Sequence, residues 1–145
     1  ISLGLVGSEM CIRDSLYTIE EWVKERDSII KQIKSDWLLC DIYAHENLHK
    51  QLLDSIIRSN NGSLLRQYTD LLKDEYPEQL LHMYRVAVEE GAKYARSRSY
   101  YHQLVRDLRT MKRIDGGNKV VDEIIKKWKV QYKNRSAMMD ELSQV

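Results

Sequence analysis

The segment Tyr76–Ala95 reads YPEQLLHMYRVAVEEGAKYA, and its pattern decides the fold class. Proline suits the first turn of an α-helix, where no backbone N–H donor is needed, so a helix is predicted to begin at Pro77. The apolar residues that follow recur mostly at intervals of three and four, which places them on one helix face: Leu80, Leu81, Tyr84, Val88, Ala92 and Ala95. The segment therefore predicts an amphipathic helix with a buried stripe.

Similar runs lie on both sides of this segment, and capping or breaking residues separate them. The strongest start signal is Thr18 with Glu21 three residues later, the pattern of a capping box. Asn60-Asn61-Gly62 is a stop signal, because asparagine and glycine favour turns. Further helix starts are predicted at Ser35, Ser63, Ser97 or Ser99, the Asp115–Asn118 turn, and Ser136. No stretch alternates apolar and polar residues as a half-buried strand would.

About eight short helices joined by turns of two to four residues predict an all-α fold of stacked antiparallel helical hairpins, a tetratricopeptide-like solenoid or bundle. Residues 37–59 are predicted to form one hairpin and residues 99–134 another. The tetratricopeptide consensus itself is absent from the sequence. We expect residues 16–145 to form a single helical domain.

Residues 1–15 differ from the rest of the chain. They contain two glycines, no helical period and no initiating methionine. They do not fit a secretory signal, since no basic segment precedes the short apolar run. They resemble a translated sequencing-adaptor remnant, so we expect a non-native or disordered leader and a chain that is a fragment of a longer protein.

Composition narrows the class of protein. The chain has 145 residues, of which 43% are hydrophobic and 31% charged, and no apolar run approaches the roughly 20 residues of a membrane span. We therefore expect no membrane partner. Cys11 and Cys40 belong to no pairing motif, which favours a reducing cytoplasmic location. We predict no cofactor.

Charge is unevenly distributed along the chain. Residues 1–92 contain ten Lys/Arg and 16 Asp/Glu, whereas residues 93–135 contain 13 Lys/Arg and four Asp/Glu. Tyrosines and a tryptophan interleave with the bases of this second region, which is typical of nucleic-acid binding. The candidate contacts are Lys93, Arg96, Arg98, Arg106, Lys129 and Arg135. The alternative is a solvated helix face, with Tyr101, Trp128 and Tyr132 in the core.

The segment His45-Glu46-Asn47-Leu48-His49 matches H-E-x-x-H. On a continuous helix His45 and His49 would lie one turn apart and could bind Zn²⁺, while Glu46 activates the metal-bound water. This would make the chain a metalloprotease.

Other features of the sequence weigh against a protease. Asn47 is a poor helix-interior residue, so Glu46-Asn47 is also interpretable as a turn that separates the histidines. A third zinc ligand has no clear candidate, and no sheet edge is predicted to hold a substrate peptide. His82 and His102 are lone helical histidines with no metal-ligand spacing.

Residues 37–145 carry aromatic, basic and glycine landmarks. They include Trp37 with Cys40–Tyr43, Tyr76-Pro77-Glu78, Arg98 with Tyr101, Gly116-Gly117, Tyr132 with Arg135, and Met138–Leu142. With these landmarks the chain resembles the C-terminal helical region of bacterial SWIM zinc-finger family proteins. The resemblance implies a tetratricopeptide-like scaffold. The zinc module of that family has the form C-x-C…C-x-H; because this chain has no C-x-C, no zinc ligand is carried over.

Three functions follow, in order of preference. The first is a non-enzymatic helical scaffold that binds a protein partner. The second is a nucleic-acid-binding module that uses the basic region 93–135. The third is a zinc protease that uses His45, Glu46 and His49.

Overall fold

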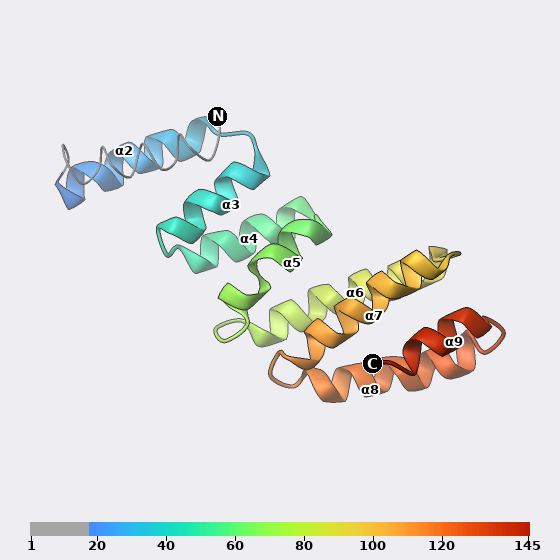
Figure 1. The fold of residues 1–145 in the computed structure, drawn as a ribbon. Helices are drawn as coiled ribbons and strands as arrows, with labels where there is room; N and C mark the ends of the chain where they lie inside the picture. The colour runs from blue at the N-terminus through green and yellow to red at the C-terminus, as the bar shows by residue number, and fades with distance from the viewer. Residues whose placement is uncertain (1–17) are drawn as a thin grey trace. The chain divides into compact units, whose positions relative to one another are not determined.

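A computed structural model describes residues 18–145; the predicted leader, residues 1–15, lies outside the described residues. All regular elements of residues 18–145 are helices, as the sequence predicts. Figure 1 shows them in chain order. Their bounds are α2 Ile19–Gln32, α3 Asp36–His45, α4 His49–Ser59, α5 Gly62–Leu72, α6 Pro77–Tyr94, α7 Arg98–Lys112, α8 Gly117–Gln131 and α9 Ser136–Leu142.

The helix ends follow local chemistry. The capping box at Thr18 is confirmed: the Thr18 hydroxyl accepts from the Glu21 N–H, and the Glu21 carboxylate accepts from the Thr18 N–H. Ser35 caps α3 through its hydroxyl, and Pro77 is the first residue of α6. Asn60 ends α4 in the left-handed conformation, with φ 51°, which asparagine tolerates better than most residues.

Two predicted caps are wrong. The helix α5 begins at Gly62, two residues before the start that a cap at Ser63 would give, and the Ser63 N–H donates to the Asn61 side chain at 2.9 Å. Ser136 is the first residue of α9 rather than its cap, and Arg135 precedes the helix without a side-chain capping bond. In both places a neighbouring residue takes the position that the serine was expected to hold.

The chain forms two compact units, and the division falls within α5 between Leu65 and Arg66. In the first unit α3 and α4 pack together as the predicted hairpin. Its core includes Leu38, Cys40, Leu52 and Ile56, all buried. Because successive turns of both helices carry buried apolar side chains, pairing the helices removes one stripe of each from water.

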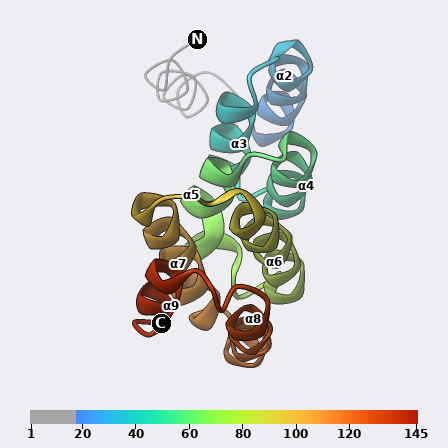
Figure 2. The same ribbon diagram turned by 90° about the vertical axis from the view of Figure 1, so that its right-hand side faces the viewer.

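The second unit contains α6 to α9 and the second half of α5. The helix α7 contacts α6, α8 and α9, and α6 also contacts α8. Figure 2 shows α9 beside α7. Tyr84, Leu108, Ile124 and Trp128 are at most 1% exposed and fill the space between these helices. The predicted hairpin of residues 99–134 corresponds to α7 and α8.

A tight turn joins α7 to α8. Gly116 has φ 79°, in the left-handed region that favours glycine. At Gly117 an added Cβ would lie 1.6 Å from the backbone oxygen of Met111. The two glycines thus allow α8 to begin directly against the last turn of α7.

Candidate functional site

The H-E-x-x-H segment is divided between two helices. His45 is the last residue of α3, and His49 is the first residue of α4. Between them Asn47 has a φ of 57°, which breaks the helix. The predicted turn is confirmed, so the two imidazoles do not share one face of a continuous helix. Within residues 18–145, no group of three or more His, Cys, Asp or Glu is arranged to hold a metal ion.

Glu46 instead joins α2 to the α3–α4 turn. The Trp22 indole N–H donates to Glu46 Oε1 at 2.9 Å, and Arg26 Nη1 lies 3.8 Å from Glu46 Oε2. His45 lies 3.7 Å from the carboxylate of Asp41, one turn earlier on the same helix. In the protease hypothesis the Glu46 carboxylate would activate a metal-bound water. In the structure it links α2 to the α3–α4 turn.

Two other side chains that could take part in chemistry, a thiol and a phenol, are buried. Cys40 is fully buried, and burial, together with the nearby Asp36 carboxylate, raises the pKa of its thiol to about 11. Tyr84 lies 1% exposed, with its hydroxyl 2.6 Å from that of Thr69. Burial raises the pKa of Tyr84. Both side chains are protonated at neutral pH and lack access to solvent, which suits a core role.

The candidate nucleic-acid contacts fall into two groups. Four of them lie at one end of the second unit, where α6 leads into α7 and α8 leads into α9: Lys93, Arg96, Arg98 and Arg135. A bond of 2.6 Å from Arg135 Nη1 to the Ala92 carbonyl joins the α8–α9 connection to the last turn of α6. Lys129 is exposed near the end of α8, and Arg106 is exposed in the middle of α7.

The aromatic side chains of this region divide between core and surface. Tyr101 and Trp128 are buried, as the core interpretation predicts, whereas Tyr132, which it also places in the core, is only half-buried. Tyr94 and Tyr100 are 71% and 63% exposed. Arg135 lies over the ring of Tyr132, with its guanidinium carbon 4.4 Å from the ring centre.

A row of bases runs along α7 and its C-cap, and it contains residues beyond the candidate contacts predicted from the sequence. Five basic side chains recur at intervals of four, four, three and four residues, and all are exposed: Arg98, His102, Arg106, Arg109 and Arg113. Such spacing places them along one side of the helix over about 22 Å, at 1.5 Å per residue. We call these five residues the α7 basic face. The same spacing is visible in the sequence and would have revealed His102, Arg109 and Arg113.

The chain's own C-terminal segment lies along part of this face. Arg98 Nη1 is 3.1 Å from Glu141 Oε1, and His102 Nδ1 is 3.1 Å from Glu141 Oε2. Further along, Arg109 Nη2 donates to the Gln144 carbonyl at 2.9 Å. Glu141 is only 3% exposed. Arg98 thus binds one oxygen of a buried carboxylate of α9, and the His102 ring lies beside the other oxygen, which accepts no hydrogen bond.

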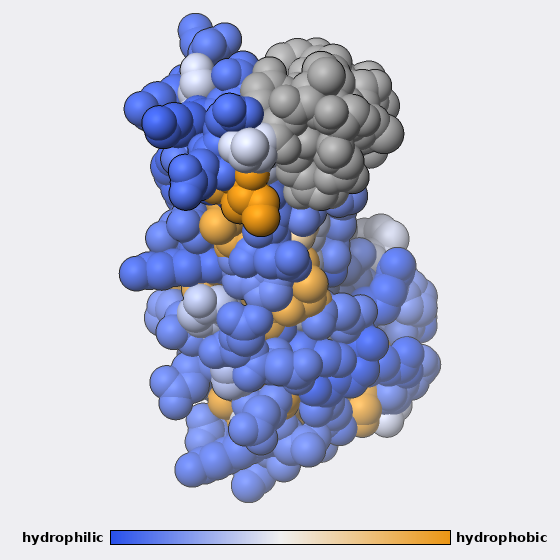
Figure 3. All heavy atoms as spheres, turned by 90° about the vertical axis from the view of Figure 1, so that its left-hand side faces the viewer, coloured by the Kyte–Doolittle hydropathy of each residue, from blue (hydrophilic) through white to orange (hydrophobic). Residues whose placement is uncertain are grey.

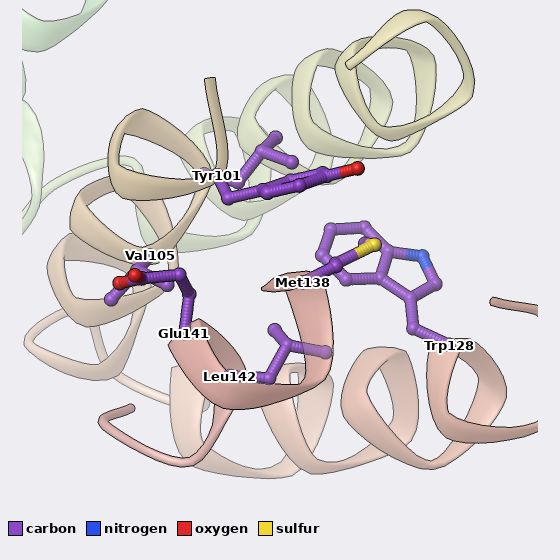
Figure 4. Close-up of a pocket in the computed structure, with 7 residues that line it drawn as sticks. Tyr101, Val105, Trp128, Met138, Glu141 and Leu142 are labelled. Atoms are coloured by element: carbon purple, nitrogen blue, oxygen red, sulfur yellow. The ribbon is translucent and has the colours of Figure 1, made fainter. Parts of the chain in front are cut away.

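Beside the carboxylate, α9 packs on apolar side chains. Met138 and Leu142 are 1% and 5% exposed and contact a seat on α7 and α8 formed by Tyr101, Leu104, Val105 and Trp128. Figure 4 shows Met138 pointing between the rings of Tyr101 and Trp128, while Glu141 points away toward Val105. The packing leaves no room for a water molecule.

Asp107 lies on a different side of α7 from the basic face. Its carboxylate accepts two bonds from Arg66 of α5, at 2.9 and 3.0 Å, and one from Gln103 at 3.1 Å. The hydrogen bond to Asp107 raises the pKa of the Arg66 guanidinium. This pair anchors the second half of α5 and does not neutralise the basic face.

Comparison of the chain with protein-family models, curated proteins and solved structures found no match. Within residues 18–145, no helix combines the length and apolar character needed to cross a bilayer.

Proposed function

We propose that this chain is a non-enzymatic helical module of the cytoplasm, tetratricopeptide-like in the pairing of its helices, that binds an acidic segment of a protein partner. The proposal includes membership of the SWIM zinc-finger family. The α7 basic face is the binding surface. The observation that best supports this proposal is the set of five exposed bases on one side of α7.

The position of α9 supports a carboxylate-bearing partner. Arg98 donates to Glu141 and the His102 ring lies beside the same carboxylate, so this face has room for a side-chain carboxylate. Arg106 is exposed on the same side of α7, between His102 and Arg109 in sequence. Arginine presents a planar fork of donors that matches a carboxylate.

The wider surface gives little support to a large apolar interface. Figure 3 shows a face on which hydrophilic side chains dominate and hydrophobic ones form small separate spots. Exposed apolar side chains such as Trp37, Ile57 and Val130 lie on different helices. Scattered apolar side chains of this kind are normal on a monomer surface, so charge is the better guide to the partner.

The test uses the full chain and fluorescein-labelled poly-glutamate as the probe, with binding followed by fluorescence anisotropy. We expect binding that weakens as salt rises, because exposed charges are screened. Arg106→Ala should weaken binding about threefold to tenfold, equivalent to up to about 1.4 kcal/mol. Lys24→Ala, which removes an exposed base from α2, is the matched control and should change little. Equal effects of the two variants would sink the proposal.

A second candidate function, binding of single-stranded nucleic acid, has one specific observation in its favour. Tyr94 and Tyr100 are exposed within a few residues of Arg96, at the connection of α6 to α7. Exposed rings can stack on bases, each worth about 1–3 kcal/mol, while arginine contacts phosphate. This candidate predicts that Tyr94→Ala weakens binding of a labelled single-stranded oligonucleotide more than Arg106→Ala does. The opposite order would exclude this site.

A further inference from the structure

We propose that α9 is an exchangeable occupant of the partner's docking site, and that the partner is an amphipathic helix with a carboxylate beside two apolar side chains one turn apart. The inference rests on the proposed function and extends it, since it names the shape and chemistry of the acidic partner segment. The pattern to be matched is Met138-x-x-Glu141-Leu142.

The basic side chains of the site are exposed on α7. The side chains of Arg98 and His102 are 60% and 51% exposed even with Glu141 in place. Both therefore reach solvent and are accessible to an incoming carboxylate. Glu141, by contrast, is 3% exposed, because α9 turns it inward against α7. Arg98 and His102 therefore form part of the surface of the second unit, and the Glu141 carboxylate docks on them.

The apolar half of the site selects a helix. Met138 and Leu142 are four residues apart, so both project from the same side of α9, with Glu141 adjacent to them. They enter a single apolar seat, which Tyr101 and Trp128 border. A helix is the conformation that brings one carboxylate and two such side chains to this surface together. An extended acidic chain would satisfy the bases and leave the seat unfilled.

The attachment of α9 is suited to exchange. It has seven residues, about two turns, and no side-chain cap at its start. Helices of this length are unstable in isolation, so contact with α7 and α8 stabilises the helical form of α9. Four residues, 132–135, connect it to α8. A partner helix with the same three side chains could take its place through the same contacts.

The experiment uses the full chain and, as the probe, a fluorescein-labelled peptide with the sequence of residues 134–145. Fluorescence anisotropy compares the unmodified protein, Glu141→Gln and the control Asp140→Asn. The control removes the same charge from the neighbouring exposed residue of α9. In the unmodified protein the tethered α9 competes strongly, because tethering gives it a high effective concentration. We expect the Glu141→Gln protein to bind the peptide about tenfold or more tightly than the control protein does.

A second peptide defines the role of the carboxylate. The same peptide with glutamine in place of its glutamate should bind the Glu141→Gln protein at least several-fold more weakly. Equal binding of the peptide by Glu141→Gln and Asp140→Asn proteins would overturn the inference. Should Glu141→Gln fail to fold, as judged by circular dichroism, Glu141→Asp keeps the charge but shortens its reach, and the same comparison applies.

The outcome separates this inference from the proposed function. If poly-glutamate binds and Arg106→Ala weakens that binding, while the peptide does not distinguish the two α9 variants, the basic face binds acidic partners and α9 is a fixed part of the fold. If neither probe binds any protein, the proposed function itself fails.

Discussion

At the scale of single residues, carboxylates that are buried or half-buried mark the places where one helix is attached to another. Glu46 accepts a hydrogen bond from Trp22 and lies near Arg26, both of α2. Asp107 accepts hydrogen bonds from Arg66 of α5. Glu141 lies against Arg98 and His102 of α7. Burying a carboxylate is costly unless bases and hydrogen-bond donors surround it. Each therefore constrains which helices pack together more than it adds to stability.

The pair of Arg66 and Asp107 gives a prediction with a definite sign. Arg66→Ala removes both arginine donors from Asp107, which is 4% exposed and keeps the hydrogen bond from the Gln103 amide. It should lower the free energy of unfolding by about 2–3 kcal/mol. Arg58→Ala is the control, because its bond to Asp36 is long, 3.9 Å, and both side chains are exposed; it should cost under about 1 kcal/mol. Urea unfolding followed by circular dichroism measures both. Similar losses would contradict the account.

Cys40 is predicted to be unreactive in the folded protein. Its thiol is fully buried, and its pKa is raised from 9.0 to about 11, so little thiolate forms at pH 8.5. The Cys11→Ser variant isolates Cys40 for reaction with a disulfide reagent such as Ellman's reagent. We expect reaction only upon unfolding. Because the folded state holds this proton more tightly than the unfolded chain does, stability should also fall as pH rises through 9 toward 11. Rapid labelling of the folded variant would show that α3 is not packed as described.

At the scale of helices, local signals predict most of the structure. The capping box at Thr18, the proline at the start of α6 and the glycine turn before α8 each depend on neighbouring residues alone, and each lies where the sequence predicts it. The serine caps of α5 and α9 are wrong because several adjacent residues can begin a helix with similar energy. Trp37, an apolar residue of α3, is 47% exposed, because the period of a short helix defines its buried face loosely.

The turn from α7 to α8 predicts a strong difference between adjacent glycines. Gly117→Ala would place a Cβ 1.6 Å from the Met111 carbonyl oxygen, and backbone cannot move aside as a side chain can. We expect a fall in thermal midpoint of more than about 10 °C, which corresponds to several kcal/mol. Gly116→Asn should be mild, because asparagine tolerates positive φ and an added Cβ there meets Leu81 at 3.8 Å. A scanning calorimeter measures both; a mild effect of Gly117→Ala would show that the turn has another geometry.

At the scale of the whole molecule, acidic and basic residues are unevenly distributed along the chain, and the structure shows where some of the bases lie. The excess of bases in residues 93–135 is evident from the sequence, and helical spacing places four of those arginines on one side of α7. The docking of α9 on that face is different. Glu141 and Arg98 lie 43 residues apart, and no local pattern predicts which helix a C-terminal segment will join.

The central claim is that an acidic partner binds the α7 basic face, and mapping of amide chemical shifts by NMR tests it most directly. Poly-glutamate is titrated into isotopically labelled full chain. The account predicts that the largest shifts occur at residues 98–113 and 136–145, and that they diminish in high salt. Shifts concentrated elsewhere, such as around Tyr94 and Arg96 or on α2, would contradict it.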